Sequence, residues 1–101
     1  MARYQGIDLE ENDYQAMCEL EKMVNEPIPI VTTFEWNTFG FAAENKRIVG
    51  IGLFGKQLFT LPQKIWGLSM LRSLMLVGNG FGKLADKFGY LKKTNEIMVE
   101  R

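Results

Sequence analysis

Residues 48–84 read IVGIGLFGKQLFTLPQKIWGLSMLRSLMLVGNGFGKL, and one spacing of apolar residues occurs twice within them. Apolar residues pair at an offset of 23 positions: Ile48 with Leu71, Ile51 with Leu74, Leu53 with Leu76, Leu58 with Phe81, Leu61 with Leu84, Ile65 with Phe88 and Leu68 with Leu91. A third copy starts at Thr94, with Ile97 and Val99 in step. A fixed period of this length is the sequence signature of stacked repeats. We therefore predict an α/β fold in which residues 46–101 form a short solenoid of about two and a half 23-residue repeats.

The upstream part of the chain predicts a cap of one helix and a β-hairpin over the first repeat. Between residues 10 and 25, Tyr14, Met17, Leu20 and Val24 recur at the spacing of an amphipathic helix. Residues 31–43 are rich in β-branched and aromatic types, and a polar turn at 44–46 separates them from a second strand at 47–54. We thus expect a single domain, with residues 1–45 as the cap and residues 1–6 as a loose lead-in to it.

The segment Leu71-x-x-Leu74-x-Leu76-x-x-Asn79-x-Phe81-x-x-Leu84 resembles the leucine-rich repeat consensus, and Leu61-Pro62 suits the length class with Leu-Pro in its outer segment. Residues 27–29 and 36–41 look like the N-terminal cap of such proteins in archaea. Lys56 stands where this family has asparagine, Ala85 replaces proline, and Thr94 and Glu96 make the third repeat polar. The resemblance implies a horseshoe segment with a parallel sheet on its concave side, which this family uses mainly to bind other proteins. Asn79 would be buried and would satisfy backbone groups left unpaired at the turn.

Alternate residues of the predicted strands point away from the core. They are Gly50, Gly52 and Phe54, then Ser73, Met75 and Val77, then Glu96, Met98 and Glu100. Large exposed apolar patches usually mark contacts. We therefore expect a concave face that binds a protein partner of unknown identity through Phe54, Ser73, Met75, Val77, Glu96 and Met98. The alternative is that a terminal segment of the chain itself folds back over this face.

The last predicted repeat leaves an open strand edge and an uncovered apolar layer, and an edge of this kind invites pairing with another chain. We expect a homodimer in which Phe88, Leu91, Ile97 and Val99 form the contact. The charges of Glu96, Glu100 and Arg101 argue partly against it, and a monomer or a fragment of a longer repeat protein are the alternatives.

Composition excludes several classes of function. Twelve basic and twelve acidic residues cancel, so nucleic acid is not an expected partner. The chain has no histidine and one cysteine, Cys18, which leaves a metal site almost without ligands; we expect no metal and no cofactor. No apolar stretch is long enough to cross a bilayer, no signal peptide is apparent, and the single thiol fits a reducing compartment, so the cytoplasm is the default location.

One motif points to a different class of protein. Gly50-Ile51-Gly52-Leu53-Phe54-Gly55 matches the G-x-G-x-x-G turn that binds dinucleotides after a strand. Pro62 interrupts the long helix that should follow, and no acidic residue ends the next strand. We therefore expect a non-catalytic protein–protein interaction module. A small nucleotide-binding protein or enzyme, or a purely architectural self-assembling subunit, are the alternatives.

Overall fold

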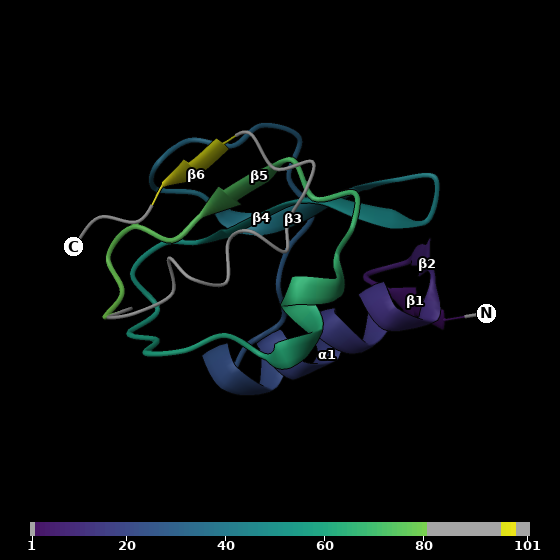
Figure 1. Ribbon diagram of the computed structural model, residues 1–101, viewed down its shortest axis with the longest axis horizontal. Coiled ribbons are helices and arrows are strands. Elements are labelled where there is room, and N and C mark those ends of the chain that lie inside the picture. The colour runs from purple at the N-terminus through teal and green to yellow at the C-terminus, as the bar shows by residue number, and fades with distance from the viewer. Residues whose placement is uncertain (1, 81–95, 99–101) are drawn as a thin grey trace.

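The computed structural model describes residues 2–80 and 96–98 of the 101-residue chain. Its elements, in chain order, are β1 (Ala2–Tyr4), β2 (Ile7–Leu9), α1 (Glu11–Val24), β3 (Phe39–Glu44), β4 (Arg47–Leu53), the 3-10 helix η1 (Gln63–Gly67), β5 (Ser73–Met75) and β6 (Glu96–Met98). Strands β1 and β2 form a small sheet, and β3, β4, β5 and β6 lie in that order in a four-stranded sheet. Figure 1 shows α1 and η1 side by side on one side of this larger sheet.

The predicted solenoid is wrong, because the described chain is a small α/β fold with one α-helix and two sheets. The larger sheet is mixed: β3 runs antiparallel to β4, whereas β4, β5 and β6 run parallel to one another. The 23-residue spacing reappears as strand register, since Ile51 lies beside Leu74 and Leu74 lies beside Ile97. A parallel register between three strands does not require a stack of equivalent coils. Here the apolar face of the strands is buried by α1 and η1, and not by successive copies of one repeat.

The core forms where the inward strand residues meet the helices. Fully buried side chains come from the sheet, from the connections that follow it and from α1: Ile48, Ile51, Leu53, Ile65, Leu68, Leu71, Leu74, Met17 and Leu20. Each such side chain contributes about 1.5–3 kcal/mol to folding through its removal from water. The helix was expected at residues 10–25, and α1 occupies Glu11–Val24 with Met17 and Leu20 on its buried side.

Two tight hairpins have the same turn geometry. In the turn between β3 and β4, Asn45 and Lys46 have φ angles of 51° and 67°, and Glu44 pairs with Arg47. In the turn between β1 and β2, Gln5 and Gly6 have φ angles of 51° and 79°, and Tyr4 pairs with Ile7. Positive φ at both central residues defines the two-residue turn that matches strand twist. The expected loose lead-in at residues 1–6 is therefore wrong for residues 2–6, which belong to this first hairpin.

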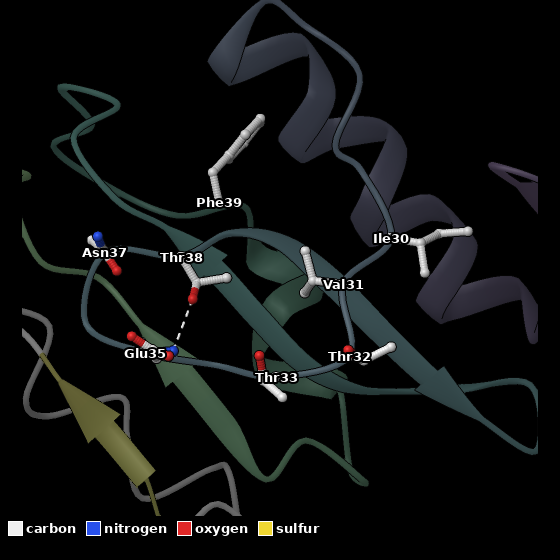
Figure 2. A pocket seen from close by; sticks show the side chains of 8 residues that line it. All are labelled: Ile30, Val31, Thr32, Thr33, Glu35, Asn37, Thr38 and Phe39. Carbon is white, nitrogen blue, oxygen red and sulfur yellow. Dashed lines mark hydrogen bonds between the residues drawn. The ribbon is translucent and has the colours of Figure 1, made fainter.

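Residues 31–38 form a loop instead of the first part of a long strand. Before it, Ile30 makes an isolated parallel bridge to Phe41, in which Phe41 N–H donates to the Pro29 carbonyl and Val31 N–H donates to the Phe41 carbonyl, both at 2.9 Å. The chain then crosses the sheet face and enters β3 directly after Thr38 (Figure 2). The loop lies on the face of the sheet opposite to Ile51, because it contacts Gly50 and Gly52, which alternate with Ile51 along β4.

Candidate functional site

The loop at residues 31–38, called the crossing loop below, fits against glycines of the sheet. A Cβ atom at Gly50 would overlap the ring of Phe34, and one at Gly52 would overlap the backbone carbonyl of Thr38. These glycines therefore permit close approach of the loop to β4. The chain itself fills the space that a ligand would need beside the first two glycines of the G-x-G-x-x-G motif. Between Gly55 and Pro62 the described chain also forms no helix.

The crossing loop changes the environment of the predicted concave-face residues. Met75 is 2% exposed and Val77 is buried, while Phe54 and Ser73 are half-buried. Met98, at 37%, is the one exposed apolar member of the set, and Glu96 is placed in β6 only by its backbone. The expected open stripe of apolar side chains is thus absent from the described face. Part of this face is covered by an internal loop, whereas the alternative in the sequence analysis was a terminal segment.

The predicted dimer-edge residues can be placed only in part. Ile97 lies in β6 and packs, half-buried, against the apolar core. Phe88, Leu91 and Val99 lie outside the described residues.

Asn79 has the structural role that its position in the repeat indicated. It is 6% exposed, and its Oδ1 accepts hydrogen bonds from the backbone N–H groups of Lys56, at 3.1 Å, and Leu58, at 2.9 Å. Its Nδ2 donates to the Leu53 carbonyl at 2.7 Å. The prediction that Asn79 satisfies backbone groups at the turn is confirmed.

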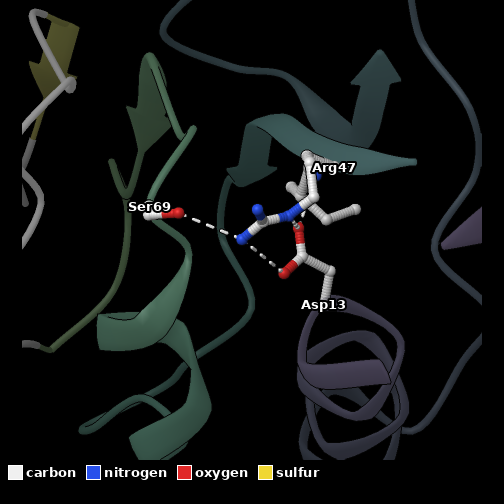
Figure 3. Close-up of polar contacts among 4 residues, drawn as sticks. Asp13, Arg47 and Ser69 are labelled. Carbon is white, nitrogen blue, oxygen red and sulfur yellow. Dashed lines mark hydrogen bonds and ion pairs between the residues drawn. The ribbon is translucent and has the colours of Figure 1, made fainter. Parts of the chain in front are cut away.

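Asp13, Arg47 and Ser69 form a polar cluster that joins three segments (Figure 3). The Asp13 carboxylate is fully buried and accepts hydrogen bonds from Ile48 N–H at 2.8 Å and from Arg47 Nε at 3.2 Å. Arg47 Nη2 donates to Ser69 Oγ at 3.0 Å. Asp13 belongs to an acidic run at the start of the helix that predicts a solvated face, and this prediction is wrong for Asp13, which is in phase with the buried Met17 and Leu20 on α1. Both charges have a partner, and the bonds from Asp13 to Arg47 and Ile48 hold α1 against β4.

Tyr4 forms a second buried polar contact, which the sequence analysis missed. Its hydroxyl donates to Glu21 Oε1 at 2.6 Å and accepts from Ile28 N–H at 2.9 Å. Burial, and then the hydrogen bond to the Glu21 carboxylate, raise the pKa of Tyr4 to about 12. The hydroxyl thus ties β1 to the last turn of α1, at Glu21, and to the chain that follows α1, at Ile28.

Two shallow hollows meet at Ile30 and Phe39. The first, of about 560 Å³, lies within the crossing loop and is lined by Ile30, Val31, Thr32, Thr33, Glu35, Asn37, Thr38 and Phe39 (Figure 2). The second, of about 550 Å³, is lined by Gln5, Glu26, Pro27, Pro29, Ile30 and Phe39. Thr38 Oγ1 accepts a hydrogen bond from Glu35 N–H at 2.8 Å, which closes the tip of the loop.

Exposed apolar side chains lie on and beside this loop. Ile30 is 49% exposed and Trp36 is 52% exposed. The Trp36 ring packs edge-on against Phe54, with centroids 5.4 Å apart and planes at 83°. An aromatic ring held in this way keeps a fixed position while half of its surface faces water.

Comparison with known proteins gives no match, whether with family models, with curated protein sequences or with solved structures. Within residues 2–80 and 96–98, no helix has the length and apolar content needed to cross a membrane. The same residues contain no group of three or more histidine, cysteine, aspartate or glutamate side chains that could hold a metal ion.

Proposed function

We propose that this protein is a non-catalytic interaction module that binds another protein through the outer surface of the crossing loop. The observation that supports this most is the half-exposed Trp36, which the contact with Phe54 holds in place. Tryptophan, with tyrosine and arginine, is enriched among the side chains that dominate binding energy at protein interfaces. A ring that is already fixed loses little conformational entropy when a partner covers it.

The polar clusters of the described residues also favour a binding role over catalysis. The carboxylate of Asp13 and the hydroxyl of Tyr4 are both fully engaged in contacts that join elements of the fold. The glycine motif supports packing of the crossing loop, so no observation favours the nucleotide-binding alternative. We place the protein in the cytoplasm, where a free thiol such as that of Cys18 stays reduced.

The test is affinity capture with three forms of the protein: wild type, Trp36→Ala and Phe59→Ala. Phe59 is the matched control, because it is also a large exposed aromatic side chain, at 77%, and lies outside the loop. We expect a protein that is retained by wild type and by Phe59→Ala but is lost with Trp36→Ala. Circular dichroism checks that all three forms are folded. If no captured protein distinguishes Trp36→Ala from wild type, the proposed function is wrong.

Self-association through β6 is a second candidate, favoured by the position of this strand. Among the described strands β6 pairs only with β5, and Leu76 N–H donates to the Met98 carbonyl at 2.6 Å. Since backbone groups of successive strand residues point to opposite sides, the N–H and carbonyl of Ile97 face away from β5. We propose that two copies pair along this edge to form a homodimer. Light scattering at several concentrations tests it. Ile97→Pro, which removes the outward N–H together with a side chain that packs on the core, should turn a dimer into a monomer, whereas Ile97→Ala, which removes the side chain alone, should not. A wild-type monomer would exclude the dimer.

A further inference from the structure

The opposite edge of the sheet, at Ile30, has backbone groups with no hydrogen-bond partner among residues 2–80 and 96–98. The bridge to Phe41 uses the carbonyl of Pro29 and the N–H of Val31. The N–H and carbonyl of Ile30 itself therefore point away from β3, because the groups of successive extended residues alternate in direction. An edge of this kind is where an extended peptide can add to a sheet through main-chain hydrogen bonds.

The surface around this edge provides side-chain contacts as well. Ile30 is 49% exposed, and its side chain points to the opposite side of the backbone from that of Val31 (Figure 2). The two hollows, of about 560 and 550 Å³, both have Ile30 and Phe39 in their walls. The residue of an added strand that bonds to the Ile30 backbone would thus lie between the two hollows. In strand addition, hollows of this kind accept alternate side chains and give specificity.

The charges in the two hollows favour a basic partner segment. Their walls include two carboxylates, Glu26 and Glu35, and no lysine or arginine. Glu26 is paired with Lys56, whose Nζ lies 3.0 Å from Oε2 and 3.8 Å from the centroid of the Phe39 ring. Glu35 is exposed and has no ion-pair partner within residues 2–80 and 96–98. One carboxylate therefore remains available to a cation on the partner.

The same features disfavour a second copy of this chain as the occupant. Pairing of two Ile30 edges about a two-fold axis would bring the unpaired Glu35 carboxylates of both copies to one interface, where like charges repel. The edge is also short, since it lies between Pro27 and the bend at Thr32. A stable dimer needs about 800 Å² of buried surface from each partner, which a rigid second copy would not reach along so few residues. A flexible extended segment, by contrast, can change direction at Pro27 and Thr32 and so enter both hollows.

We propose that the partner of this protein supplies an extended segment that adds as a strand at Ile30 and places a lysine or arginine next to Glu35. The proposal rests on the proposed function, since it names how the same surface is recognised. In this partner segment, alternate residues with apolar side chains would occupy the hollows around Ile30 and Phe39. The basic side chain of the segment would contact the crossing loop at Glu35.

The test uses a phage-displayed library of random peptides, selected separately on wild type, Ile30→Pro, Ile30→Ala and Glu35→Lys. Ile30→Pro removes the outward N–H but none of the hydrogen bonds to β3, and the preceding Pro29 already favours the extended backbone that a proline requires. Ile30→Ala keeps the N–H and is the matched control for loss of the side chain. Wild type should select lysine- or arginine-containing peptides rich in β-branched residues. Their affinity should fall at least about tenfold with Ile30→Pro and clearly less with Ile30→Ala.

Glu35→Lys keeps the test decisive if Ile30→Pro does not fold. Residue 35 is exposed, and reversal of its charge should shift the selected peptides from basic to acidic. The proposal is overturned if no peptides are enriched, if Ile30→Pro folds and binds the same peptides equally well, or if Glu35→Lys leaves the charge preference unchanged. A dimer that disappears with Ile30→Pro would overturn it in favour of a second copy. Loss of a natural partner with Trp36→Ala but not with Ile30→Pro would leave the proposed function standing and remove only this inference.

Discussion

Single polar residues join the elements of this molecule by satisfying buried backbone groups. Asp13 accepts from Ile48 N–H, the Tyr4 hydroxyl accepts from Ile28 N–H, and Asn79 accepts from Leu58 N–H. Each of these bonds connects residues far apart in sequence. A buried N–H that loses its partner costs about 1–3 kcal/mol, so these three side chains matter more to stability than surface ion pairs do.

Replacement of Asp13 by alanine should lower the free energy of unfolding by about 2–3 kcal/mol, because it leaves Ile48 N–H without a partner and Arg47 without its carboxylate. The control is Asp8→Ala, which removes an exposed ion pair to Arg3 and should cost about 0–1 kcal/mol. Urea unfolding measures both variants. Equal losses of unfolding free energy in the two variants would show that the buried Asp13 cluster does not stabilise the fold more than an exposed ion pair does.

Tyr4 should make stability depend on pH in the alkaline range. Its pKa is about 12 in the folded protein and 10.0 in an ordinary setting, so the folded state favours the protonated hydroxyl. The resulting stabilisation is complete below about pH 10 and is lost as the pH rises toward about 12. We expect the difference in melting temperature between wild type and Tyr4→Phe to shrink over this range. A constant difference would contradict the assignment.

At the scale of elements, the apolar pattern predicted the strand register and the buried residues, but not the architecture. Ile51, Leu74 and Ile97 are neighbours in the sheet at the predicted 23-residue offset, because inward residues of parallel strands must meet in one layer. The period cannot say what covers that layer, and α1 with η1 covers it as well as further repeats would.

The crossing loop was unpredictable for a related reason. Val31, Thr32 and Thr33 have strand composition, and only the contacts of Phe34 and Thr38 with Gly50 and Gly52 reveal a loop.

The predicted exposure of the concave-face residues was wrong in part for the same reason. Phe54, Met75 and Val77 were expected to face solvent, but a pattern of alternate residues does not show which segment packs on the outer face. Trp36 and Ile30 are exposed apolar residues beside the covered face, whereas the composition of residues 31–43 indicated only a strand of the cap.

Gly50→Ala should displace the crossing loop without unfolding the sheet, since the new Cβ would overlap the Phe34 ring. Overpacking of this kind costs about 1–3 kcal/mol, and truncation of the opposing ring should relieve part of it. We expect faster chymotrypsin cleavage at Phe34 and Trp36 in Gly50→Ala. In a double-mutant cycle, Gly50→Ala and Phe34→Ala should be coupled. Strictly additive effects would mean that the loop does not rest on Gly50.

At the scale of the whole molecule, the sheet separates two roles. The face that bears Ile51 and Leu74 packs on α1 and η1 and holds the fold together. The other face supports the crossing loop, which presents Trp36 and borders the Ile30 edge. A rigid layer beneath a short loop is a common way to position binding residues.

The most direct test of the crossing loop as a binding surface is photo-cross-linking with a benzophenone amino acid at position 37, and at position 59 as the control. Residue 37 is exposed on the crossing loop and its replacement leaves Trp36 in place, while Phe59 is exposed elsewhere. We predict a covalent adduct with a partner protein from position 37, suppressed by Trp36→Ala, and none from position 59. Adducts of equal yield from both positions, or none from position 37, would contradict the claim that the crossing loop is a binding surface.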